Sequence, residues 1–101
     1  MNKIITEHKK EVTKIFKAHK IEKAFLFGSI NTKEFHAKSD IDFLILFKKN
    51  IPPLEKGELW WNLHDKLRNL FNREIDLVTE SSLKNPYFIK EINNTKELIY
   101  G

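Results

Sequence analysis

The chain has 101 residues, 41% of them hydrophobic and 32% charged, which suffices for one small domain over residues 1–101 and is too short for two. It contains no cysteine and no stretch long and apolar enough to cross a membrane, so we expect neither disulfides nor an anchor, and a cytoplasmic location. The net charge of +4 comes from lysines scattered along the chain, which favours a solvated surface over direct nucleic-acid binding.

The first half of the sequence predicts one helix and two strands. Apolar residues recur on one helical stripe from Ile4 to His19, which indicates an amphipathic helix of about four turns. Residues 21–27 form an apolar strand, and the polar residues 30–39 form a loop or a short helix. Residues 41–47 are apolar on both faces, as in a central buried strand.

In the middle of the chain two prolines, Pro52-Pro53, interrupt the regular secondary structure. A second amphipathic helix is expected from about Leu54 to Phe71, and a third strand at residues 74–79. Asn85 is a good helix cap before Pro86, so a short helix should run to about residue 92, and residues 98–100 add an edge strand. This order predicts an α+β fold in which helices cover a small mixed β-sheet.

Three aspartates carry the chemistry of the sequence. Asp40 and Asp42 project to one side of the second strand, roughly 6–7 Å apart at their Cα atoms. Carboxylates held in this way repel each other, and a divalent cation between them removes that repulsion. Asp76 lies in a strand expected to pair beside them, on the face opposite Ile75 and Leu77. Oxygen ligands of this kind select magnesium or manganese.

The pair Gly28-Ser29 ends the first strand and suits a phosphate, because glycine lets the backbone approach closely while a serine hydroxyl and exposed amides bind oxygens. Each feature alone has an ordinary explanation. A Gly-Ser pair is usually a plain turn, an isolated Asp-x-Asp is common, and Asp76 can pair with Arg73. In this order, between these strands, the features together predict a metal-assisted site for phosphate chemistry.

Residues 26–29 and 40–42, separated by ten residues, resemble the Gly-Ser-x10-Asp-x-Asp signature of the DNA polymerase beta-like nucleotidyltransferase superfamily. The strand at residues 75–79, with Ser82-Leu83-Lys84 and Asn85-Pro86 after it, is similar to the minimal nucleotidyltransferase branch. That branch contains the antitoxin partners of HEPN-domain toxins. The similarity covers nearly the whole chain and implies the polymerase beta-like fold.

The resemblance also implies a mechanism. Asp40 and Asp42 would hold two magnesium ions, and Asp76 would complete the catalytic metal site and help to deprotonate an acceptor hydroxyl. Gly28 and Ser29 would bind the β and γ phosphates of a nucleoside triphosphate, whose α phosphate the acceptor attacks as pyrophosphate leaves. Proteins of the antitoxin branch transfer AMP from ATP to a tyrosine of the HEPN toxin, so a HEPN-type partner is expected.

One segment departs from the family pattern. Many members follow Gly-Ser with Arg-Ala-Arg-Gly, whereas this chain has Ile30-Asn31-Thr32-Lys33. Lys33 or Lys38 can replace the arginines as a point charge, without the planar fork of a guanidinium. Lys33 and Ser39, the residue before Asp40, complete the predicted phosphate-binding set.

Two other functions stay open. A non-catalytic module could mask a partner by contact alone, which the altered loop and Trp61, either exposed or bordering the core, motivate. An aminoglycoside-type transferase is a third reading, although the chain is short for a small-molecule acceptor pocket. The same small size leaves no dedicated base-recognition domain, so the sequence predicts a hetero-complex or a homodimer.

Overall fold

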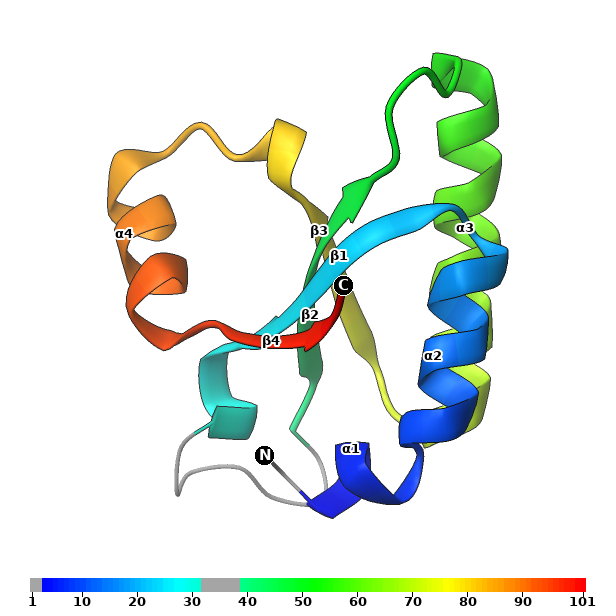
Figure 1. The fold of residues 1–101 in the computed structure, drawn as a ribbon. Coiled ribbons are helices and arrows are strands. Elements are labelled where there is room, and N and C mark those ends of the chain that lie inside the picture. The colour runs from blue at the N-terminus through cyan, green and yellow to red at the C-terminus, as the bar shows by residue number, and fades with distance from the viewer. Residues whose placement is uncertain (1–2, 32–38) are drawn as a thin grey trace.

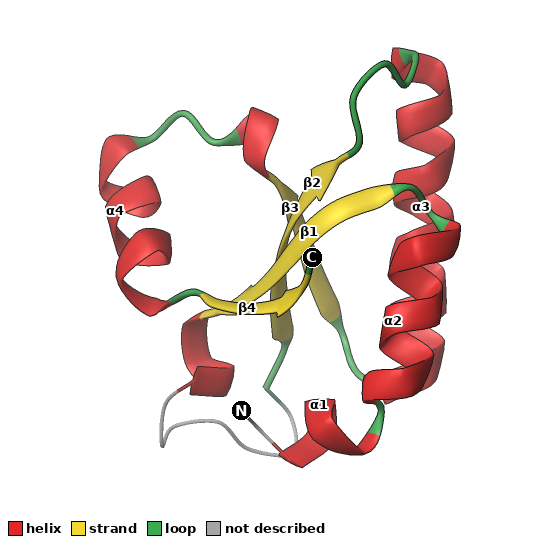
Figure 2. Ribbon diagram, viewed as in Figure 1, coloured by secondary structure: helices red, strands yellow, loops and turns green. Residues whose placement is uncertain are grey.

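A computed structural model describes residues 3–31 and 39–101 and forms one mixed sheet flanked by helices (Figures 1 and 2). The strand order is β3-β2-β1-β4. Strand β1 (Ile21–Phe27) pairs antiparallel with both β2 (Ile41–Phe47) and β4 (Glu97–Tyr100), whereas β2 pairs parallel with β3 (Ile75–Thr79). The predicted α+β class and the predicted strands, including the one at the sheet edge, are confirmed.

The N-terminal helical region consists of two helices, α1 (Lys3–Glu7) and α2 (Lys9–Ala18), so the prediction of a single helix was wrong. The break lies at His8, whose φ of −110° and ψ of 12° are outside the helical range. Its ring Nδ1 lies 2.8 Å from the Ile4 carbonyl oxygen, and its ring packs edge-on against Phe71 with 5.3 Å between centroids. These contacts hold the chain in a turn that the hydrophobic stripe does not reveal.

The two helices of the second half of the chain begin and end where their local sequences predict. Helix α3 (Pro53–Phe71) starts after the proline break and ends at Asn72, whose left-handed φ of 52° closes the last turn. Helix α4 (Pro86–Thr95) is capped by Asn85, whose Oδ1 accepts a hydrogen bond from the Tyr87 amide at 2.9 Å. The predicted cap is therefore confirmed. Within the described ranges, no helix combines the length and the apolarity that a bilayer-spanning segment needs.

The two faces of the sheet are covered unequally (Figure 1). Helices α2 and α3 pack on one face, where β2 contributes Phe43 and Ile45 to the main core. Helix α4 lies over the other face, against a smaller cluster of Phe27, Leu44 and Ile92. Because side chains alternate along a strand, β2 sends its aspartate to this second face. Among the described residues, this partial cover leaves the face open around Asp42, which is half-buried, and Asp76, which is exposed.

The two tryptophans of α3 differ in environment, as expected for neighbours on one helix. Trp60 is partly buried and its indole Nε1 donates a hydrogen bond to the Leu77 carbonyl at 3.1 Å. Trp61 is 63% exposed and stands edge-on to Trp60, with 4.8 Å between ring centroids. Of the two alternatives left by the sequence for Trp61, the structure favours exposure.

Candidate active site

The three aspartates meet on the open face of the sheet. Asp42 in β2 and Asp76 in β3 are register partners, which places their Cα atoms about 4.8 Å apart across the parallel pair. Asp40 directly precedes β2, and it lies near enough to Asp42 for its charge to raise the pKa of that carboxyl. Asp42 is half-buried, whereas Asp40 and Asp76 are exposed. The expected pairing of the two strands is present, and the catalytic roles of the carboxylates stay predictions.

Gly28 brings the end of β1 against Asp42. Phe27 is the register partner of Asp42, and Gly28 follows it with a φ of +75°, a conformation that residues with side chains rarely adopt. A Cβ atom at this position would collide with Oδ2 of Asp42. The turn into the short 3-10 helix η1 (Gly28–Asn31) therefore passes directly beside the carboxylate. The predicted phosphate-binding turn and the predicted metal-binding pair adjoin each other.

The electrostatics of this corner are those of crowded like charges. Burial, and after it the neighbouring charges of Asp76 and Asp40, together raise the pKa of Asp42 from 3.8 to about 6. Burial acts because a carboxylate loses hydration when it is partly covered, and the two neighbours act by repulsion. A positive charge placed among the three carboxylates would relieve all of these effects.

The chemistry of the donor set fits a divalent cation that is shared with a substrate. Within residues 3–31 and 39–101, no group of three or more His, Asp or Glu side chains is arranged to hold a metal ion unaided. Magnesium is commonly bound by one or two carboxylates and completes its shell with water and substrate phosphates. The raised pKa of Asp42 is consistent with that kind of site, because burial and the like charges of Asp76 and Asp40 all disfavour its ionised form.

Arg73 has a role that sequence reasoning did not identify. The sequence offered it only as a partner for Asp76, whereas its Nη1 donates a hydrogen bond to the Ser39 carbonyl at 3.1 Å. The Ile41 amide also donates to the Glu74 carbonyl at 3.1 Å. These two bonds tie the chain entering β2 to the chain entering β3, which keeps the acidic residues of both strands adjacent. This link between the two segments can be recognised only when the parallel pairing of β2 and β3 is known.

The structure describes only some of the residues predicted to bind phosphate. Ser39 is half-buried directly before Asp40, and Ser29 lies in η1. Lys33 and Lys38 lie outside the described residues. The phosphate-binding roles of Gly28, Ser29, Ser39 and Lys33 therefore stay predictions.

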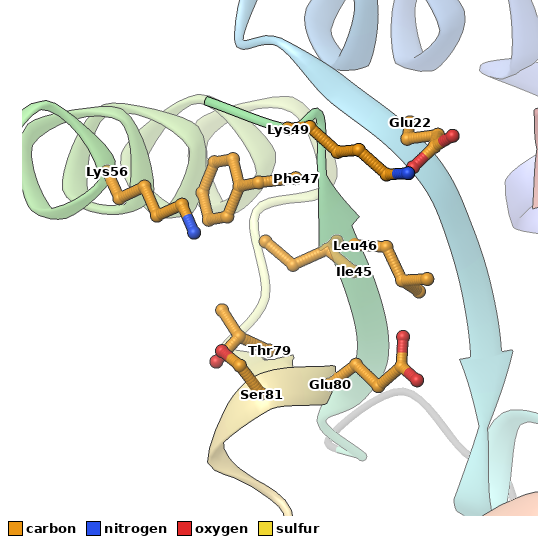
Figure 3. A pocket seen from close by; sticks show the side chains of 9 residues that line it. All are labelled: Glu22, Ile45, Leu46, Phe47, Lys49, Lys56, Thr79, Glu80 and Ser81. Atoms are coloured by element: carbon orange, nitrogen blue, oxygen red, sulfur yellow. The ribbon is translucent and has the colours of Figure 1, made fainter. Parts of the chain in front are cut away.

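Hollows elsewhere on the sheet are less suited to a triphosphate. One of about 230 Å³ lies where β2 and β3 end and is lined on β2 by residues 45–47 (Figure 3). Lys49 and Lys56 line it, but so do Glu22 and Glu80, so their charges balance. Another of about 350 Å³ lies between α4 and the first two strands. Since none of the three aspartates lines either hollow, the open sheet face is the candidate site.

The pKa of Asp42 predicts how the stability of the metal-free protein depends on pH. Because the folded pKa is raised, the folded state holds this proton more tightly than the unfolded state, and the resulting stabilisation is lost between about pH 4 and pH 6. We expect the free energy of unfolding to fall by about 1 kcal/mol from about pH 5 to pH 7.5, after allowing for solvent screening. Urea unfolding in EDTA measures it, and Asp42→Asn should remove the loss. An identical pH dependence in both proteins would contradict the assignment.

The fold and this corner together define a class of protein, the nucleotidyltransferases, in which a Gly-Ser turn and strand-borne aspartates share one sheet face. A family model described as "Polymerase beta, Nucleotidyltransferase" matches residues 10–101. The chain belongs to the polymerase beta nucleotidyltransferase family.

Similar proteins of Methanocaldococcus jannaschii include two that are named as candidate protein adenylyltransferases, MJ0126 and MJ0128. The first is 35% identical over 100 residues, covering 99% of this chain and 93% of the relative. The second is 35% identical over 97 residues, covering 96% of this chain and 90% of the relative.

Solved structures share the fold at lower sequence identity. A toxin–antitoxin complex with AMP-PNP contains a chain that matches with a TM-score of 0.71 and 22% identity. The match covers 92% of this chain and 73% of that one. A structure described as a candidate minimal nucleotidyltransferase has a TM-score of 0.69 and 21% identity, covering 96% and 95%. The complex of a tri-AMPylated Shewanella oneidensis HEPN toxin with its MNT antitoxin has a TM-score of 0.66 and 19% identity, covering 95% and 71%.

Proposed function

We propose that this nucleotidyltransferase transfers AMP from ATP to a hydroxyl group of a partner protein. The observation that carries the proposal is the contact between the Gly28 turn and the half-buried Asp42, with Asp76 as the register partner of Asp42. This contact brings a backbone suited to phosphates against carboxylates that need a cation. The names of the archaeal relatives as protein adenylyltransferases support a protein as the acceptor.

Different residues of the chain have different roles in the proposed reaction. The backbone of the turn at Gly28 and Ser29 binds the phosphates distal to the reacting one, and Asp40 and Asp42 line the path of the α phosphate. The acceptor oxygen bonds to the α phosphorus, the bond from that phosphorus to the bridging oxygen breaks, and pyrophosphate leaves. Asp76 is exposed on the open face and takes the acceptor proton. Positioning of the two reactants supplies much of the rate.

Magnesium is part of the proposal. Asp40, Asp42 and Asp76 would hold it, one ion or two, and manganese offers the same preference for oxygen ligands. When bound, the metal neutralises charge on the phosphates and favours departure of pyrophosphate.

For the partner, we propose a HEPN-type toxin modified on a tyrosine, which gives this chain an antitoxin role. Structural neighbours with bound AMP-PNP or with an AMPylated HEPN toxin support this choice of partner and nucleotide.

A transfer assay tests the proposal. The protein is incubated with ATP labelled at the α phosphate, magnesium and a purified HEPN-type protein as candidate partner. We expect label on the partner, no label when EDTA is present, and at least about a hundredfold slower transfer by Asp76→Asn, since Asp76 accepts the proton. The matched control is Asp65→Asn, which changes an exposed aspartate of α3 and should leave transfer unchanged.

The outcomes separate catalysis from masking. If no label reaches the partner from the wild-type protein, the proposed activity is wrong. If Asp76→Asn still silences the partner fully without any transfer, the chain acts as a binding module that masks its partner by contact.

A further inference from the structure

Strand β3, which carries Asp76, is an edge strand of the sheet and pairs with β2 on one side. The Ile41 amide donates a hydrogen bond to the Glu74 carbonyl, so the carbonyl that precedes β3 points toward β2. Successive carbonyls point to opposite sides of a strand, so those of Ile75 and Leu77 point to the outer edge, away from β2. Asp76 therefore lies between two carbonyls that β2 does not bond.

Two side chains of α3 reach these outward carbonyls. The indole Nε1 of Trp60 donates to the Leu77 carbonyl at 3.1 Å, and the imidazole Nε2 of His64 lies 3.1 Å from the Ile75 carbonyl oxygen. A carbonyl oxygen only accepts, so Nε2 carries the proton and donates it to this bond. The two rings are stacked, with 5.4 Å between their centroids and 12° between their planes. We call Trp60 and His64 the edge clamp.

Packing alone does not account for a histidine in the edge clamp. The Nδ1 of His64 is buried, and among the described residues no hydrogen-bond partner reaches it: Asp65 Oδ1 is 3.7 Å away. A buried nitrogen without a partner costs free energy, and an apolar side chain of similar size would fill the same space without that cost. What the histidine adds is the bond from Nε2 to the Ile75 carbonyl. The residue is therefore explained by its bond to β3.

We propose that the edge clamp positions Asp76 for the transfer reaction. This inference rests on the proposed function, in which Asp76 takes the acceptor proton. Strand β2 holds one side of β3 through the ladder, and the edge clamp holds the other side at the residues just before and just after Asp76. A strand bonded on both sides moves less, and a proton acceptor works only within a narrow range of positions. Trp60 and His64 are thus positioning residues, which act through Asp76.

Variants that keep an aromatic ring and lose the donor test the edge clamp in the transfer assay. We expect Trp60→Phe and His64→Phe each to lower kcat about tenfold and to change the KM for ATP less than about twofold, because the phosphates bind at the Gly28 turn. His64→Gln, whose amide donates in place of Nε2, should keep kcat within about threefold of the wild-type value. Trp61→Phe is the matched control: it changes an exposed tryptophan that packs against both rings of the edge clamp, and should leave kcat unchanged.

Two further measurements separate positioning from a general effect on the fold. In an Asp76→Asn background the same substitutions should slow the remaining transfer less than about twofold, since the edge clamp then has no proton acceptor to position. Hydrogen exchange of the metal-free protein, followed by NMR, needs no reaction. The Asp76 amide should exchange about tenfold faster in Trp60→Phe and His64→Phe, whereas the amides of β1 should be unaffected, because the opening is local to the edge.

Each other outcome overturns the inference. Unchanged kcat in Trp60→Phe and His64→Phe would mean that Asp76 needs no edge clamp, and if one of the two does not fold, the other decides. An equal loss in the Asp76→Asn background, or in Trp61→Phe, would assign the effect to the fold. Absence of transfer by the wild-type protein defeats the proposed function and this inference with it, whereas normal wild-type transfer without an effect of the edge clamp defeats this inference alone.

Discussion

Asp42→Asn is expected to slow nucleotidyl transfer by at least about a thousandfold while leaving the protein folded. Asp42 lies between Asp76 and the Gly28 turn, so its charge faces both the proposed cation and the phosphates. The amide keeps the shape of the side chain and removes that charge. Single-turnover transfer of labelled AMP at saturating ATP measures the loss.

The same substitution is expected to stabilise the metal-free protein near neutral pH. The pKa of Asp42 is raised to about 6, so ionising this carboxylate opposes folding above that pH, and asparagine removes the opposition. Urea unfolding in EDTA measures the gain, with Asp65→Asn as the control for an exposed aspartate. Lower activity together with lower stability would instead indicate a folding defect, and full activity would remove Asp42 from the catalytic site.

Much of this fold follows from local sequence patterns. The apolar runs of β1 and β2, the proline break before α3 and the Asn85 cap are each determined within a few residues, so periodicity and capping rules find them. The turn at His8 is different. It depends on packing against Phe71, which is distant in sequence, and a helical stripe continues through it unchanged.

In the candidate site, too, some features follow from local sequence and others depend on the packing of distant segments. The alternation of β2 and β3 was enough to place Asp42 and Asp76 on one face, because only the pairing of two strands had to be assumed. The tie from Arg73 to the Ser39 carbonyl needs the register of those strands, which no local pattern contains.

Gly28→Ala is expected to lower both stability and activity, because the same glycine serves backbone geometry and the site. Its φ of +75° disfavours a side chain, and an added methyl group would collide with Oδ2 of Asp42. We expect a loss of about 1–3 kcal/mol in the free energy of unfolding and a decrease in transfer of at least about a hundredfold. Urea unfolding and single-turnover transfer measure the two effects.

Gly57→Ala is the matched control, since a methyl group there meets nothing within 4 Å and the site is a helix interior. It should stabilise the protein by about 0.5–1 kcal/mol and leave transfer unchanged. The collision itself can be isolated in an Asp42→Ala background, where the stability cost of Gly28→Ala should shrink by about 0.5–3 kcal/mol. An undiminished cost would assign the effect to backbone strain alone. Unchanged transfer by Gly28→Ala would place the phosphates away from this turn, and with them the ATP site.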